Sequence, residues 1–261
     1  MNCIFCKKNS DHSKSVEHII PESLGNKEHY LSKGIVCDKC NNYFANKIER
    51  PMLELPYFIS VRHRNIIENK KGRVPIEQGM LLNPSGSKVN FHREKDGNSL
   101  SFEEEAAYHW IKNKSKFTVI ALVNEQPPHD NPFISKFLGK VAIEAFAKIG
   151  VDVKGGIEDI VSNPGLDPLR NYVRFGTEPK FWPYHVRPIY PETHYFIDKD
   201  TNDSYEVLHE FQLFQTTAHQ WHLVLVIFGF EYCIDLTGPD TVSYIVWLKK
   251  NNNISPLYHQ L

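Results

Sequence analysis

The chain has 261 residues, a mass of 30.3 kDa, a formal net charge of −1 and a pI near 6.9. Its hydrophobic content of 41% and aromatic content of 12% are ordinary for a globular protein and argue against intrinsic disorder. The near-neutral charge counts against a non-specific DNA-binding protein, but not against a protein with a local contact surface. The length suits one large domain, or a small domain beside a medium one.

Four of the five cysteines lie in two C-x-x-C pairs near the start of the chain. Cys3 and Cys6 form the first pair, and Cys37 and Cys40 form the second. Four thiolates in two such pairs can close a tetrahedral zinc site, which would be structural because no position is left for water. So short a segment buries too little apolar surface to fold alone, and the zinc would supply what the core lacks.

The two cysteine pairs flank the run Ser15-Val16-Glu17-His18-Ile19-Ile20-Pro21. Two asparagines, Asn41 and Asn42, directly follow Cys40. The ordinary pKa of imidazole lies near neutral pH, so His18 is the candidate general base. Glu17 and Asn41 offer oxygen ligands suited to a hard divalent ion such as Mg²⁺. The segment that the zinc would close therefore carries a base and two candidate metal ligands.

These residues resemble the HNH endonucleases, whose core is a ββα-metal finger. The runs 17–25 and 36–44, with the cysteine pairs around them, resemble the subgroup stapled by zinc. The resemblance covers residues 1–55 and is specific, because several spaced elements agree in order and type. It implies a metal-dependent endonuclease that hydrolyses phosphodiester bonds in DNA, with structural zinc and catalytic Mg²⁺ or Mn²⁺. The base and ligand roles fall on the three residues named above.

The chain departs from the commonest HNH pattern at the middle asparagine, whose place before the third cysteine is taken by Ser32. What orients His18 therefore stays open, and a backbone carbonyl is one candidate. Each proposed site residue also has a structural alternative: packing for His18, a solvated acid for Glu17 and helix capping for Asn41. Asn42 is the second candidate for the role of the amide.

Within the first unit, residues 16–20 and 33–36 suit short strands, and residues 41–49 suit a helix. We expect this helix to end at Arg50, because the residue before Pro51 disfavours the helical region. Further helices are predicted at 103–113, 135–149 (with Ser135 as its cap), 167–174 and 241–250. Strands are predicted at 119–123, 205–215 and 222–236, and turns at 83–86 and 95–98.

The predicted fold class is α+β. An N-terminal ββα-metal or treble-clef-like HNH domain at 1–55 precedes a connecting region at 56–100 and an α+β domain at 101–261 with an antiparallel sheet. The basic stretch 62–73 either tracks phosphates or is a solvated loop. The arginines and aromatics of 170–187 form either a nucleotide pocket or a packed edge of the core.

Small HNH proteins with an extra C-terminal domain resemble effectors of anti-phage defence, in which that domain senses a trigger or recruits a partner. We expect DNA as the substrate, with RNA as the alternative. The rival interpretation is a non-catalytic zinc finger that binds nucleic acid or protein. No apolar stretch has the length of a membrane span, and Cys3 leaves no room for a signal peptide. We therefore expect a soluble, cytoplasmic protein; its oligomeric state stays open.

Overall fold

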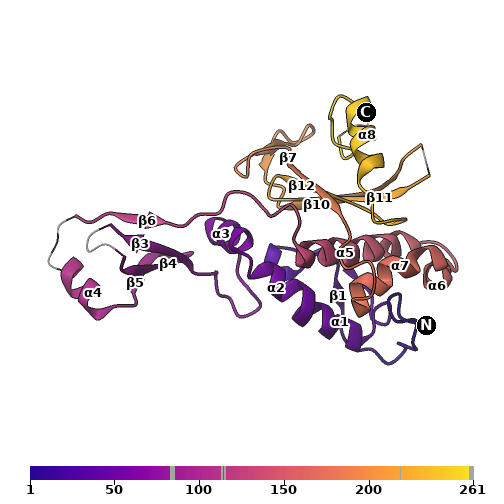
Figure 1. The fold of residues 1–261 in the computed structure, drawn as a ribbon, viewed down its shortest axis with the longest axis horizontal. Helices are drawn as coiled ribbons and strands as arrows, with labels where there is room; N and C mark the ends of the chain where they lie inside the picture. Colours follow the sequence, from indigo (N-terminus) through magenta and orange to yellow (C-terminus); the bar gives the residue numbers. More distant parts are fainter. Residues whose placement is uncertain (83–85, 113, 115, 218, 259–261) are drawn as a thin grey trace. The chain divides into compact units, whose positions relative to one another are not determined.

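The computed structural model describes residues 1–82, 86–112, 114, 116–217 and 219–258. Contacts group the chain into two units, drawn in Figure 1. The first unit comprises residues 1–21, 26–52 and 129–261, and the second comprises residues 22–25 and 53–128. The first fifty residues thus share a unit with the C-terminal half. The three-part division expected from the sequence, with boundaries at 55 and 100, groups the chain differently and stays a prediction.

The first unit begins with a small finger of two strands and a helix. Strand β1 (Glu17–His18) pairs antiparallel with β2 (Tyr30–Leu31), and α1 (Asp38–Phe44) follows. The connection between the strands contains a short 3-10 turn, η1 (Glu22–Leu24), which is grouped with the second unit. The strand predicted at 33–36 is wrong: the chain turns there, because Gly34 adopts a positive φ of 92° that suits glycine.

The finger helix continues past the proline that was expected to end it. After α1 come a π-helical turn, η2 (Ala45–Glu49), and α2 (Arg50–Leu53). Arg50 keeps helical angles, φ −58° and ψ −51°, and its N–H bonds to the carbonyl of Ala45 five residues earlier. The wider π turn accommodates the ring of Pro51, which would clash with a carbonyl in a regular helix.

The large sheet of the first unit has the order β10-β11-β12-β7, with every neighbouring pair antiparallel. Its strands are β7 (Tyr184–Pro188), β10 (His209–Gln215), β11 (Trp221–Ile227) and β12 (Phe230–Asp235). The single strand predicted at 222–236 is two strands, because Phe228 and Gly229 both take positive φ and form a tight turn. The strand predicted to begin at Tyr205 is likewise divided. A small hairpin of β8 (Phe196–Ile197) and β9 (Ser204–Tyr205) precedes β10.

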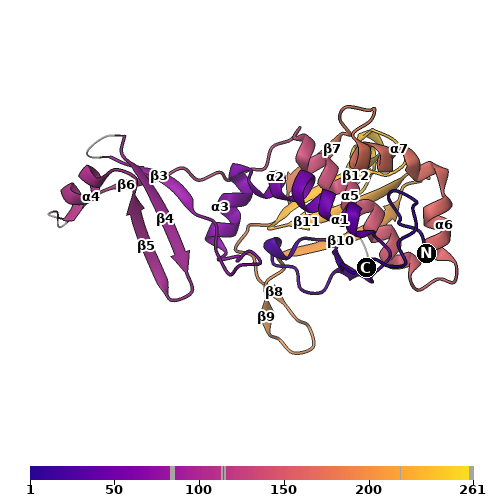
Figure 2. The same ribbon diagram turned by 90° about the horizontal axis from the view of Figure 1, so that it is seen from below.

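Helix α5 (Pro132–Gly150) is the centre of the first unit. Thirteen of its nineteen residues are buried, because the sheet packs along one side and elements of the finger pack along another. Figures 1 and 2 show α5 running across the sheet, and Figure 1 shows α8 (Val242–Lys250) on the opposite face. Asn131 caps the start of α5 by accepting from two backbone N–H groups. The predicted cap, Ser135, instead lies inside the helix and donates to the carbonyl of Trp182.

Four short helical segments connect α5 to β7. They are α6 (Gly156–Ser162), η3 (Pro164–Leu166), α7 (Asp167–Arg170) and η4 (Asn171–Phe175). Arg170, Tyr172 and Trp182 are all buried in this part of the unit. Their burial favours the packed core edge over the nucleotide pocket for these three residues.

The second unit is folded, although part of it was expected to be a connecting region. Its sheet has the order β5-β4-β3-β6. The elements are α3 (Pro56–Arg64), β3 (Glu77–Leu81), β4 (Lys88–Glu94), β5 (Gly97–Phe102), α4 (Glu105–Lys112) and β6 (Val119–Ala121). Helix α4 packs on one face through a cluster that contains Leu81, Val89 and Ala107. Arg62 and His63 of the basic stretch are buried, so this stretch is not simply a solvated loop.

The mixture of helices and antiparallel sheets confirms the α+β class. The turn predicted at 83–86 falls mostly on residues outside the described part of the chain, as does Asn113 at the expected end of α4. Among the described residues, no helix combines the length and the hydropathy that a membrane crossing needs.

Candidate functional site

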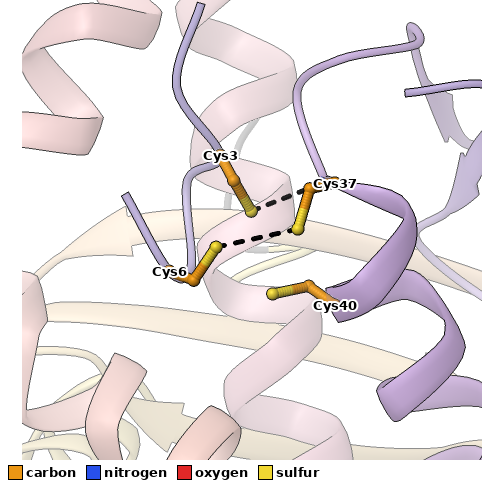
Figure 3. Close-up of side chains that lie close together, drawn as sticks. All are labelled: Cys3, Cys6, Cys37 and Cys40. Atoms are coloured by element: carbon orange, nitrogen blue, oxygen red, sulfur yellow. Dashed lines mark hydrogen bonds between the residues drawn. The ribbon is translucent and has the colours of Figure 1, made fainter. Parts of the chain in front are cut away.

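The four cysteines of the two C-x-x-C pairs meet at the base of the finger. Their sulfur atoms all lie within 4.8 Å of one another, and Sγ of Cys6 lies 3.6 Å from Sγ of Cys37. Figure 3 shows the pair Cys3 and Cys6 facing the pair Cys37 and Cys40 at the start of α1. Tetrahedral zinc with bonds of about 2.3 Å to sulfur separates its ligands by about 3.8 Å. Four free thiols at this spacing fit a structural zinc site.

Backbone hydrogen bonds hold both cysteine turns in shape. The first turn closes through Lys7 N–H to the carbonyl of Cys3, at 2.9 Å, with Lys7 in the left-handed region at a φ of 57°. The second closes through Cys40 N–H to the carbonyl of Cys37, also at 2.9 Å. The N–H of Cys37 points at Sγ of Cys3, 3.4 Å away. This last donor favours the thiolate of Cys3, the form that binds a metal.

The strand that carries the proposed base places its two residues in different surroundings. Glu17 is buried and pairs across the hairpin with Leu31, whereas His18 is half-buried and pairs with the exposed Tyr30. The rings of His18 and Tyr30 have their centroids 6.4 Å apart. Adjacent residues of a strand point to opposite faces, so His18 lies toward the outside and Glu17 toward the interior.

Asn41 lies inside helix α1, where its side chain reaches the strand. Its Nδ2 donates to the carbonyl of Val16 at 3.1 Å, directly before Glu17. The helix begins after Cys37, which is the N-cap residue, so the capping alternative for Asn41 is wrong. The other candidate, Asn42, is exposed and its side-chain oxygen accepts from Asn46. The hydrogen bond to the strand therefore favours Asn41 over its neighbour.

Lys140 of α5, which was not among the residues expected at the site, reaches the buried side of β1. Its ammonium lies 2.8 Å from Oε1 of Glu17, 2.8 Å from Oε1 of Glu49 and 3.0 Å from Oε2 of Glu144. It also donates to the carbonyl of His18 at 2.9 Å. Glu17 is therefore not a solvated acid but part of a buried ionic cluster.

The charges of this cluster are unbalanced, with three carboxylates around one ammonium. Burial alone would lower the pKa of Lys140, but the attraction of Glu144, Glu17 and Glu49 outweighs it and holds that pKa well above its usual range. Burial raises the pKa of Glu144 well above its usual value, against the opposing effect of Lys140. The cluster thus keeps Lys140 charged and favours a proton on Glu144.

Asn26 performs a structural task in the loop between the two strands. It is fully buried, and its amide donates to the carbonyls of Ile20 and His29. Its oxygen accepts from the N–H groups of Glu28 and His29, at 3.0 and 2.9 Å. Ser32, where the middle asparagine was expected, is exposed. A buried asparagine that fixes this loop is therefore present, but earlier in the chain than the pattern indicates.

Comparisons with known proteins agree with the geometry of the finger. Residues 3–54 match the family model described as HNH endonuclease. No curated protein and no solved structure gives a significant match to the chain. The matched segment contains both cysteine pairs, the strand with Glu17 and His18, and the helix with Asn41. The N-terminal region of this chain holds an HNH endonuclease domain, and a larger domain with an antiparallel sheet follows it.

Proposed function

We propose that the protein is a metal-dependent HNH endonuclease that hydrolyses phosphodiester bonds in DNA. The observation that carries this proposal is the hydrogen bond from Asn41 to the residue before Glu17, within the segment that matches the family. It brings the amide to the strand that presents His18.

His18 would act as the general base. A neutral imidazole accepts a proton from water near pH 7, and the resulting nucleophile attacks phosphorus. The bond from phosphorus to the leaving oxygen breaks, and that oxygen then takes up a proton. His18 is half-buried on the outward side of β1, so a DNA backbone can approach it while the strand stays in place.

Glu17 and Asn41 would hold the catalytic ion. A bound Mg²⁺ or Mn²⁺ would offset the charge that develops on the phosphate and the leaving oxygen. The nitrogen of the Asn41 amide is used by the carbonyl of Val16, so its oxygen is the ligand atom. Lys140 contacts Oε1 of Glu17, as charged partners of metal-binding carboxylates commonly do. The four cysteines would hold structural zinc and take no part in the chemistry.

One observation favours the alternative of a non-catalytic zinc finger. Glu17 is only 4% exposed and is paired with Lys140, as expected for an acid with a purely structural role. In that case the finger would bind nucleic acid or protein without cutting it. The two functions differ in what happens to DNA after binding.

The test is cleavage of supercoiled plasmid by zinc-loaded protein in Mg²⁺, Mn²⁺ or EDTA. We expect nicking or linearisation that requires the divalent ion and is lost in His18→Ala. His12→Ala is the matched control, because His12 is an exposed histidine of the same finger and should leave cleavage unchanged. DNA binding without cleavage by both wild type and His18→Ala would support the alternative. A parallel assay with single-stranded RNA decides between the two nucleic acids.

An anti-phage role belongs to this proposal by analogy with small HNH proteins that carry an extra C-terminal domain. It predicts that expression of the wild-type chain lowers the plating efficiency of a phage, and that His18→Ala abolishes this effect. The cytoplasmic location and a partner or activating ligand for the C-terminal region also stay predictions.

A further inference from the structure

The buried side of the proposed active strand is held by one side chain from outside the finger. Lys140 is completely buried in α5 and lies more than a hundred positions along the chain from β1. The family match ends at residue 54, so this lysine is not part of the matched segment. Its contacts with β1 are therefore made from outside the segment that matches the family model.

The ammonium serves more acceptors than it has protons. Five oxygen atoms surround its three N–H groups: three from carboxylates, and the carbonyls of His18 at 2.9 Å and Ile19 at 3.4 Å. Two of these five atoms belong to the backbone that carries the proposed base. The strand has only two residues, so its pairing with β2 provides few hydrogen bonds to fix that backbone.

We propose that Lys140 is a positioning residue for the nuclease: it fixes the backbone of His18 and orients the carboxylate of Glu17. This inference rests on the proposed function, because it assigns the base to His18. Lys140 itself lies on the interior side of the strand and does not touch the substrate. Its effect is transmitted through the main chain of β1, where a small displacement of a reacting group is costly to the rate.

The experiment compares Lys140→Met with Glu144→Gln in the full-length, zinc-loaded protein. Glu144 is the matched control because it is equally buried and contacts Lys140 one turn away on α5. In Lys140→Met we expect kcat to fall about 100-fold, as for a misplaced catalytic group, with KM for plasmid changed by less than about threefold. We expect Glu144→Gln to stay within about twofold of wild type. Lys140→Arg keeps the charge and the donors, and should recover part of the lost rate.

Zinc content and circular dichroism establish whether each variant is folded. If Lys140→Met does not fold, the kcat of Lys140→Arg is compared with that of wild type instead. Equal kcat in folded Lys140→Met and wild type would overturn the inference. So would a loss that merely follows the folded fraction. If wild type itself does not cut, the proposed function fails, and the NMR signals of the His18 ring and amide decide the positioning role. Shifts in Lys140→Met that are absent from Glu144→Gln support it, and unchanged signals refute it.

Discussion

Nε of Arg174 donates to Sγ of Cys40 across 3.1 Å, although the two residues lie 134 positions apart. The guanidinium also lies over the ring of Tyr43, 4.3 Å from its centroid. Four thiolates and one Zn²⁺ carry a net charge of −2, which a neighbouring cation stabilises. The cysteine cluster that fits zinc is thus supported by η4, from the C-terminal half.

Replacing Arg174 should loosen the zinc. Loss of a charged hydrogen bond to a metal ligand typically costs 10–100-fold in metal affinity. We expect Arg174→Met to release zinc to a competing chelator about tenfold faster than wild type, with Arg174→Lys in between. Arg73→Met, at an exposed arginine of the second unit, should release zinc at the wild-type rate. Equal release rates in all four proteins would refute a role for Arg174 at the metal.

Asn26 should be critical for the stability of the finger. Alanine removes four hydrogen bonds and leaves a buried carbonyl of Ile20 and partly buried backbone groups of Glu28 and His29 without that partner. Because each such group costs about 1–3 kcal/mol, we expect Asn26→Ala to lower the free energy of unfolding by about 2 kcal/mol or more. Urea unfolding of the zinc-loaded protein measures this change.

The control for Asn26 is Asn46→Ala. Asn46 is exposed, and its amide donates to the carbonyl and the side-chain oxygen of Asn42, one helical turn earlier. Its replacement should change the unfolding free energy by less than about 0.5 kcal/mol. A loss at Asn26 no larger than that at Asn46 would contradict the assigned role.

The sequence predicted the features that depend on local spacing. The two C-x-x-C pairs, the E-H-I-I-P run and the following helix are short-range patterns, and their chemistry constrains how they meet. The long helix near 135–149 was also predictable, because its apolar residues recur with helical periodicity. These features account for the finger and for the centre of the first unit.

The contacts between distant segments were not predictable from spacing. Lys140 and Arg174 are ordinary basic residues in the sequence. No local pattern indicates that Lys140 contacts β1 or that Arg174 contacts Cys40. One signal was available for Lys140: it lies with Glu144 in an otherwise apolar helical run, spaced i,i+4. A charged pair within the buried stripe of a helix requires buried partners. The partners themselves could be identified only from the fold.

Glu17 and Glu49 allow the metal role of Glu17 to be separated from its structural role. Both carboxylates lie 2.8 Å from Nζ of Lys140, one on the strand and one on η2. We expect Glu17→Gln and Glu49→Gln to lower the unfolding free energy by similar amounts, about 1–3 kcal/mol. Only Glu17→Gln should also raise the Mg²⁺ concentration needed for half-maximal cleavage, by about tenfold or more, because only Glu17 is a proposed ligand.

A Mg²⁺ titration of plasmid cleavage by the two variants makes this comparison. If both variants keep the wild-type Mg²⁺ midpoint, Glu17 is not a ligand, and its role is the ion pair with Lys140. If both midpoints rise together, the cluster as a whole shapes the site. In either case the assignment of Glu17 as a metal ligand would have to be withdrawn.

Two histidines should make the first unit sensitive to acid. The rings of His29, in the loop before β2, and His209, on β10, have their centroids 5.5 Å apart. Burial lowers the pKa of His209 to about 4, with a further contribution from His29, and burial also lowers the pKa of His29. An unfolded histidine titrates near pH 6.5. Between about pH 6.5 and 4 the unfolded chain therefore binds a proton at His209 that the folded chain does not.

This difference in bound protons determines how the stability of the folded protein changes with pH. Stability falls as the pH is lowered through that window, by up to about 1.4 kcal/mol per pH unit for one histidine. We expect urea unfolding between pH 7 and 4.5 to show a smaller loss of stability in His209→Gln than in wild type. His12→Gln, at an exposed histidine, should keep the wild-type slope. Protonation of the cysteines also destabilises the zinc site in acid, but it affects all three proteins equally. An unchanged slope in His209→Gln would therefore show that His209 titrates normally in the folded protein.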